Sequence, residues 1–277
     1  DIGMVFQDFA LFPHLSVFEN IAFGIKKLCF IAKADLKQRV MEVLELVGLI
    51  GLQHRYPHEL SGGQQQRIAL ARAIAPKPKL VLLDEPLSNL DVQVRLHLRQ
   101  ELRVILKAAK TSAIFVTHDQ EEALAISDRV AVMRCGALEQ VGSPEEIYST
   151  PASKFVAEFV TQANFLNAER HGQAWTTELG SFDAWSIEES KDHLNHFGWL
   201  MIRQEDMLLK PDRQGRAIIL DHQFLGREYR YRLRTPSGQT LYALSKSTEG
   251  LAKGVTVSIT AKAQPLQIFP QEAKTYG

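Results

Sequence analysis

The chain has 277 residues, enough for one or two domains with a substantial hydrophobic core. Its 32 lysines and arginines balance 32 aspartates and glutamates, so it lacks the basic footprint of a nucleic-acid-binding protein. No apolar run approaches the roughly 18 residues of a membrane-spanning helix. We therefore expect a globular protein with no nucleic-acid partner.

The first part of the chain alternates between predicted strands and helices. The expected order is a strand (2–7), a helix (35–49), a helix (62–74), a strand (79–85), a helix (92–109), a strand (112–119), a helix (120–128) and a hairpin with Gly136 at its turn. The expected strands at 79–85 and 112–119 each contain an uninterrupted apolar run (80–83 and 113–116), which is typical of parallel strands buried on both faces. Such alternation predicts an α/β domain with a parallel sheet.

The pattern changes after about Asn164, where short alternating runs separated by turn residues predict antiparallel strands. We therefore divide the chain into an α/β domain at residues 1–160 and a small β-rich domain at residues 161–277.

Polar residues stand at the carboxyl ends of three predicted strands: Gln7, the pair Asp84–Glu85, and His118. Ligands of parallel α/β sheets bind at the carboxyl ends of the strands. One carboxylate of the pair could hold Mg²⁺ while the other polarises a water, as phosphoryl transfer requires. The alternatives are a helix-capping pair, a structural histidine and a solvent-exposed glutamine.

The segment Ser61-Gly62-Gly63-Gln64 opens the predicted helix at 62–74. Free backbone amides at a helix start suit an anion, and glycines permit its close approach. The alternative is that Ser61 is an ordinary N-cap and that the glycines serve tight packing.

Taken together, these segments resemble the ATP-binding subunit of ABC transporters. The resemblance covers about the first 160 residues and rests on five motifs of that family: the Q-loop (VFQ, 5–7), the signature (LSGGQQQR, 60–67), Walker B (LVLLDEP, 80–86), the D-loop (LSNLD, 87–91) and the switch-histidine loop (VTHD, 116–119). It implies an ATP-hydrolysing enzyme with a P-loop NTPase-like fold.

The resemblance also implies roles for individual residues. Glu85 would be the general base, His118 would contact the γ-phosphate, and Asp84 and Gln7 would serve Mg²⁺. The signature residues Ser61, Gly62, Gly63 and Gln64, together with Asp91, would bind ATP. Two copies would pair head to tail, so that each signature faces the nucleotide of the partner.

The later part resembles the regulatory β domain of importer ATPases, with an OB-like fold, through RQEDMLL (203–209) and FLGREYRYRL (224–233). This implies transmembrane permease subunits as partners, which would contact residues 9–23. It also implies a periplasmic solute-binding protein as an indirect partner. The subunit would lie peripherally at the cytoplasmic face of the inner membrane. FVTQANFL (159–166) favours ferric iron as the solute, with polyamine, sugar or sulfate as alternatives.

One motif of the family is missing, because the chain contains no GxxxxGK[ST] phosphate loop. In the family this loop precedes the Q-loop, so we interpret the chain as N-terminally truncated before Asp1 and expect it to be inactive alone. Two other readings are a non-catalytic interaction module and a soluble ABC protein of translation or repair; the β domain argues against the second.

Overall fold

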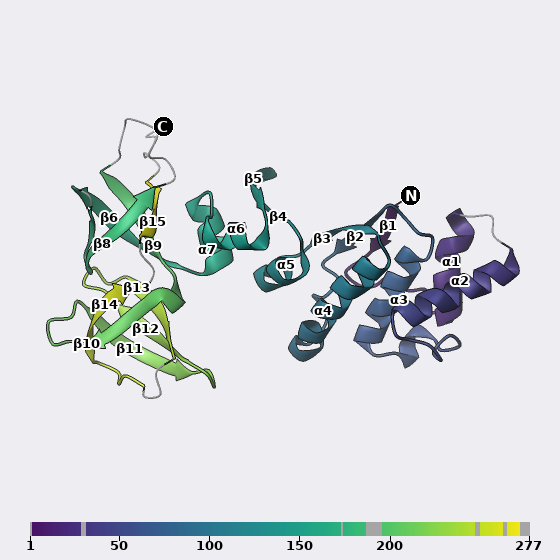
Figure 1. Cartoon of the computed structure of the whole chain (residues 1–277). Helices are drawn as coiled ribbons and strands as arrows, with labels where there is room; N and C mark the ends of the chain where they lie inside the picture. The colour runs from purple at the N-terminus through teal and green to yellow at the C-terminus, as the bar shows by residue number, and fades with distance from the viewer. Residues whose placement is uncertain are drawn as a thin grey trace. The chain divides into compact units, whose positions relative to one another are not determined.

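The computed structural model describes residues 2–28, 32–172, 174–186, 196–246, 250–262 and 265–271. The chain forms two compact units, Asp1–Val130 and Ala131–Gly277, each of which is described by itself (Figure 1). No helix within these described ranges is both long and apolar enough to cross a bilayer.

The first unit contains a three-stranded sheet in the order β1-β2-β3, formed by Ile2–Val5, Leu80–Asp84 and Ser112–Val116. Both pairings are parallel, and Leu83 lies between Val5 on one side and Phe115 on the other. This confirms the predicted α/β class with a parallel sheet. It also brings the ends of three strands that are far apart in sequence to one edge.

Five helices accompany the sheet: α1 (Val17–Leu28), α2 (Lys33–Leu46), α3 (Gly62–Ile74), α4 (Val92–Ala108) and α5 (Gln120–Ile126). Their buried apolar residues join Val81 and Leu83 of β2 in a single core. The helix predicted from Asp35 begins two residues earlier, at Lys33, so Asp35 lies in its first turn rather than at its cap.

The prediction that β2 and β3 are buried on both faces is wrong for the described residues. Ile114 and Val116 of β3 are each 53% exposed, and Ile2 of β1 is 60% exposed. Alternate residues such as Val81 and Leu83 are buried in the core with the helices. The helices of this unit therefore cover one face of the sheet and leave the other apolar face uncovered by described residues.

The second unit begins with the predicted hairpin and two short helices. Strands β4 (Val130–Arg134) and β5 (Ala137–Gly142) pair, with Gly136 at φ +81° in the turn between them. Helix α6 (Pro144–Ser149) and helix α7 (Lys154–Thr161) follow. The left-handed residue Gln162, at φ 48°, ends α7 and leads into the β-rich part.

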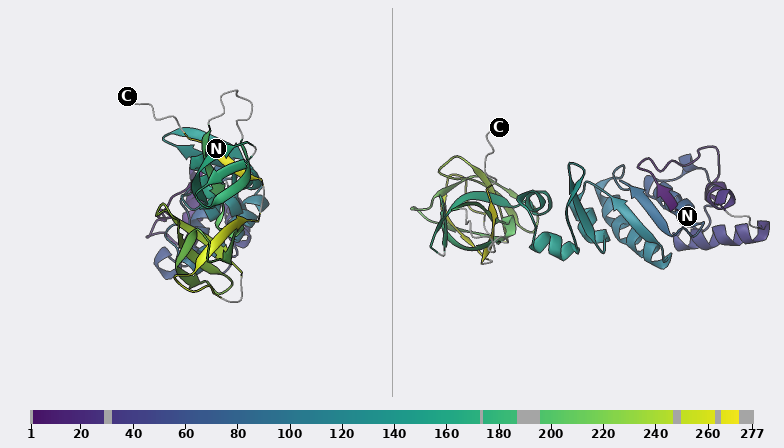
Figure 2. Two further views of the ribbon diagram at one scale, coloured as in Figure 1. Left: turned by 90° about the vertical axis from the view of Figure 1, so that its left-hand side faces the viewer. Right: turned by 90° about the horizontal axis from the view of Figure 1, so that it is seen from above.

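The β-rich part confirms the predicted small β domain. One set of strands closes into a barrel in the order β15-β8-β7-β6-β9, and another forms a five-stranded sheet in the order β10-β14-β11-β12-β13 (Figures 1 and 2). The barrel strands are β6 (Asn164–His171), β7 (Ala174–Thr177), β8 (Gly180–Ser186), β9 (Phe197–Ile202) and β15 (Leu266–Pro270). The sheet strands are β10 (Met207–Pro211), β11 (Ala217–Phe224), β12 (Tyr229–Arg234), β13 (Thr240–Ser245) and β14 (Thr256–Ala261).

The two sets of strands share one hydrophobic core, in which Leu166 and Leu200 of the barrel pack with Tyr231 and Leu241 of the sheet. The pairings are antiparallel as predicted, apart from β15 with β8, which run parallel. The segment before the barrel is bonded to it, because Gln267 Nε2 donates to Pro151 O at 2.8 Å. The two compact units divide after Val130. The predicted domain boundary between residues 160 and 161 stays a prediction.

Candidate functional site

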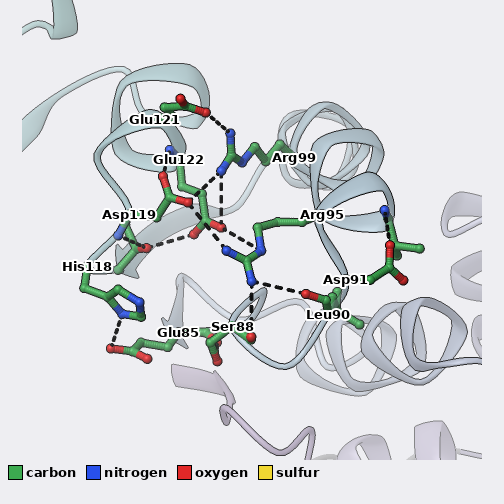
Figure 3. Close-up of polar contacts among 12 residues, drawn as sticks. Glu85, Ser88, Leu90, Asp91, Arg95, Arg99, His118, Asp119, Glu121 and Glu122 are labelled. Carbon is green, nitrogen blue, oxygen red and sulfur yellow. Dashed lines mark hydrogen bonds and ion pairs between the residues drawn. The ribbon is translucent and has the colours of Figure 1, made fainter. Parts of the chain in front are cut away.

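The carboxylate of Glu85 lies between two other predicted site residues. Gln7 Nε2 donates to one carboxylate oxygen at 3.3 Å, and His118 Nδ1 lies 3.0 Å from the other (Figure 3 shows the His118 contact). Each residue follows a different strand of the parallel sheet, so the shared edge brings them together. The structure therefore unites Gln7, Glu85 and His118, as the sequence predicted.

Glu85 itself stands just beyond β2, in a left-handed conformation with φ 42°. Such a backbone is uncommon for a residue other than glycine and is retained where its surroundings fix it. Here the amide of Glu85 donates to Val116 O at 3.0 Å, and Ser88 Oγ donates to the carbonyl of Glu85 at 2.9 Å. The backbone that carries the carboxylate is thus held on both sides.

His118 is mostly exposed, and its contact with Glu85 determines its titration. The hydrogen bond to Glu85 is the main cause that raises the pKa of His118, followed by the charge of Glu85. The charges of Glu122 and Asp119 act in the same direction, while partial desolvation opposes them. The ring of His118 is therefore protonated up to a higher pH than an isolated histidine and can donate to an anion.

Asp84 is the last residue of β2 and its side chain is exposed. Among the described residues it has no hydrogen-bond or ion-pair partner, so its carboxylate is free to bind a cation. The described part of the chain holds no cluster of three or more acidic, His or Cys side chains that could hold a metal by themselves. A magnesium ion here would need phosphate oxygens or water for its remaining ligands, as Mg²⁺ usually does.

The second group of predicted residues lies at the start of α3. Ser61 is the N-cap and accepts a hydrogen bond from the amide of Gln64 at 3.4 Å, and Gln64 Oε1 accepts one from the amide of Ser61 at 3.0 Å. This is a complete capping box, which explains why the helix begins where it does. Ser61 is thus the N-cap of α3, as the alternative interpretation predicted.

The two glycines of this segment pack against neighbouring side chains. A Cβ on Gly63 would lie 3.2 Å from Leu98 and 3.3 Å from Val94, and one on Gly62 would lie 3.0 Å from Leu90. Glycine at these positions therefore lets α3 approach α4 and the loop before it. The packing reading of the glycines is supported, and a contact with a nucleotide stays a prediction.

An open hollow adjoins this segment and is lined by Gly48, Leu49, Ser61, Gly63, Gln64, Arg67, Gln93, Val94, His97 and Leu98. None of Gln7, Asp84, Glu85 or His118 lines it. Asp91 does not line it either; it is the N-cap of α4 and accepts from the amide of Val94 at 3.0 Å. Ser61, Gly63 and Gln64 thus lie at this hollow, whereas Gln7, Glu85 and His118 contact one another outside its lining.

Several polar residues that support the site were missed at the level of sequence. Asn89 Nδ2 donates to Gln7 O at 2.9 Å, which joins the loop after β2 to the loop after β1. Arg95 and Arg99 of α4 bind carboxylates of the turn that follows His118 (Figure 3). An arginine within an amphipathic helix gives no local signal of a distant partner, so the fold is needed to find such contacts.

Comparison with known proteins supports the reading of both parts of the chain. A family model described as "ABC transporter" matches residues 1–88, and one described as "TOBE domain" matches residues 200–269. A solved structure of cbiO1 from Clostridium perfringens, described as part of the ABC transporter complex cbiONQ, aligns with a TM-score of 0.50 at 31% identity. That alignment covers 55% of this chain and 60% of the other.

Three named relatives align along almost the whole chain. It is 44% identical to the sulfate/thiosulfate import ATP-binding protein CysA 2 of Chromobacterium violaceum, over 99% of this chain and 76% of that protein. It is 39% identical to the trehalose/maltose import ATP-binding protein MalK of Thermococcus litoralis, over 97% and 76%. It is 38% identical to the Fe(3+) ions import ATP-binding protein FbpC of Brucella melitensis, over 98% and 77%.

Proposed function

The chain belongs to the ABC transporter family as the ATP-binding subunit of an importer, and from this premise we propose that Glu85 is the general base of its ATP hydrolysis. The observation that carries the proposal is the position of the Glu85 carboxylate between Gln7 and His118 at the end of the parallel sheet. A base must lie within hydrogen-bond reach of the water that it activates. The exposed edge at Glu85 leaves room for that water.

The neighbours of Glu85 have complementary roles in this proposal. Asp84 binds Mg²⁺ through its free carboxylate, and Gln7 adds its amide oxygen as a ligand while its amide nitrogen donates to Glu85. His118 donates to the γ-phosphate of ATP, because a ring whose pKa is raised by Glu85 carries a proton more of the time. Together they stabilise negative charge as it shifts during phosphoryl transfer.

The group at the start of α3 serves the second nucleotide of a homodimer. Ser61, Gly62, Gly63 and Gln64 offer a helix N-terminus and a hydroxyl to the ATP held by the partner copy, as Asp91 does at the start of α4. Their separation from Glu85 on one chain is the observation that supports two half-sites completed by a second copy.

The 277 residues include no GxxxxGK[ST] segment, so we propose that this chain by itself does not hydrolyse ATP at an appreciable rate. A polypeptide element with a phosphate-binding loop must complete the site. The uncovered apolar face of the sheet, with Ile2 and Ile114 exposed, is a surface that such an element could cover.

In the importer we place the subunit at the cytoplasmic face of the membrane, bound to permease subunits and acting indirectly with a periplasmic solute-binding protein. For the solute, ferric iron stays a prediction, and the relatives named for sulfate or thiosulfate and for trehalose or maltose make those the alternatives. Uptake of each solute by cells with and without the subunit distinguishes them, since loss of one uptake identifies the solute.

The test of the base is Glu85→Gln in the assembled importer. We expect ATP binding to persist and turnover to fall by about 10²–10⁴-fold, the usual contribution of a general base. The matched control is Glu45→Gln, which neutralises an exposed carboxylate on α2. Wild-type turnover in Glu85→Gln would show that another group is the base.

A further inference from the structure

A cluster of opposite charges joins α4 to the turn between β3 and α5 (Figure 3). The Arg99 guanidinium is 8% exposed and lies 2.8 Å from Asp119 and 3.7 Å from the carboxylate of Glu122, which is 3% exposed. Arg95 faces the same two carboxylates at 3.6 Å and 3.8 Å. Charges removed from water to this extent are costly unless they are paired, so the cluster fixes where its members lie.

The carboxylates of this cluster also fix the backbone around His118. Thr117 Oγ1 donates to Glu122 at 2.8 Å and accepts from the amide of Asp119 at 3.0 Å. Asp119 Oδ1 in turn accepts from the amide of Glu122 at 3.1 Å, as the N-cap of α5. The residues on both sides of His118 are therefore bonded, although the ring of His118 is 71% exposed.

Arg95 differs from Arg99 because it also binds the loop that follows Glu85. Its Nη2 donates to Ser88 O at 3.3 Å and to Leu90 O at 3.1 Å. Ser88 is itself bonded to the carbonyl of Glu85 at 2.9 Å. One guanidinium thus contacts both the loop that carries Glu85 and the turn that carries His118.

The chemistry of arginine suits this double contact. Its planar guanidinium presents five N–H donors in a fixed geometry, so it can bind two carbonyls on one side and carboxylates on the other. A lysine at the same position keeps the charge but has a single nitrogen. Among the described residues, Arg99 pairs with carboxylates alone and serves as the buried counter-charge.

We propose that Arg95 is a positioning residue for ATP hydrolysis, which joins loop 85–91 to turn 117–122 and so holds His118 against Glu85. Because Arg95 binds the same loop that includes the cap of α4, a displacement of residues 87–91 by a partner copy is transmitted to His118 through this side chain. The inference rests on the proposed function for its effect on turnover, but its structural part does not.

The first arm of the test is an NMR measurement on this chain. The ring nitrogen resonances of His118 in Glu85→Gln give the reference for a ring without its carboxylate partner. We expect Arg95→Ala and Arg95→Lys to move these resonances toward that reference. The amide spectrum of the rest of the chain should stay that of the folded wild type. The matched control is Arg103→Ala, which removes an α4 arginine that pairs with Asp128 at 2.7 Å instead.

The second arm is ATP turnover by the assembled importer. We expect Arg95→Lys to lower kcat by about tenfold with little change in KM, because nucleotide binding does not depend on this contact, and Arg103→Ala to leave both unchanged. Unchanged His118 resonances in both Arg95 variants would overturn the proposal, whatever the turnover. Shifted resonances with wild-type kcat would overturn its catalytic part. If Glu85→Gln left turnover intact, the proposed role of Glu85 as the base would be wrong. The NMR measurement would still show whether Arg95 positions His118.

Discussion

At the scale of single residues, the candidate site depends on how one carboxylate is shared. Glu85 accepts from Gln7 with one oxygen and contacts His118 with the other. Each carboxylate oxygen keeps a further lone pair for a water, and the contact with His118 uses ring atom Nδ1 rather than Nε2. The three side chains therefore hold one another in place and leave acceptor and donor sites for a water and a phosphate.

The titration of His118 tests this arrangement directly. We expect Glu85→Gln to lower the pKa of His118 toward its ordinary value of about 6.5, because the main cause of the raised pKa is removed. Glu122 and Asp119 keep part of the upward shift. The measurement is an NMR titration of the histidine ring, with Glu45→Gln as the control.

The raised pKa of His118 also determines how the stability of the folded chain depends on pH. A histidine with a raised pKa in the folded chain stabilises it most below the ordinary pKa, and this contribution is lost as the pH rises through the raised pKa. A pKa of His118 that was equal in the wild type and in Glu85→Gln would contradict the contact.

The sequence predicted Gln7, Glu85 and His118 as one group because parallel strands place their ends at one edge. It did not predict Arg95 or Arg99. Their partners Asp119 and Glu122 lie 20 or more positions away, and no periodicity in a helix identifies the partner of a charged side chain. The arginines could be assigned only once α4 and the turn after β3 were placed side by side.

At the scale of elements, the start of α3 combines two properties that are easily confused. Ser61 completes a capping box with Gln64, and it is also the hydroxyl proposed to bind the nucleotide of a partner copy. Loss of activity on its replacement would not separate a folding defect from a binding defect. Two different replacements can separate them.

We expect Ser61→Ala to lower the free energy of unfolding by about 0.5–2 kcal/mol, because the helix loses its N-cap. Ser61→Asp keeps a capping oxygen and is expected to retain stability, yet its charge would repel the phosphates and weaken ATP-dependent dimerisation. Urea unfolding of the two variants gives the stability, and sedimentation with ATP and with the element that supplies the phosphate loop gives the dimerisation. Wild-type dimerisation of Ser61→Asp would contradict the role in nucleotide binding.

The boundaries of α3 were predicted correctly because a cap and a following proline mark them locally. The burial of β3 was predicted wrongly. An apolar run shows that a strand can be buried, but it does not show which other element covers the strand. The segment at 159–166, read as a hint of the solute, also has structural roles, and the solute stays a prediction. Asn164 is buried and its amide donates to Ile202 O at 3.2 Å and to Tyr242 O at 2.8 Å. Gln162 ends α7 and its carbonyl accepts from Gln204 at 2.8 Å.

At the scale of the whole molecule, the change of sequence pattern near residue 164 correctly indicated a second fold. The division into compact units falls earlier, at Val130, because contacts with no local signature hold α6 and α7 to the barrel. Arg203 donates to Tyr148 O at 2.6 Å, and Tyr148 donates to Glu205. These bonds join residues more than 50 positions apart, so neither composition nor periodicity reveals them.

The second unit has its own core, and we therefore expect a fragment of residues 131–277 to fold alone. Its buried apolar residues, from Leu166 to Ile268, all lie within the fragment, and about 150 residues suffice to bury a core. Amide NMR spectra of the fragment and of the whole chain are expected to coincide for residues of the barrel.

A second fragment that begins at residue 163 lacks the bonds of Tyr148 and Pro151 and should unfold at a lower urea concentration. Equal midpoints would show that α6 and α7 do not stabilise the barrel, and an unfolded longer fragment would show that the second unit depends on the first.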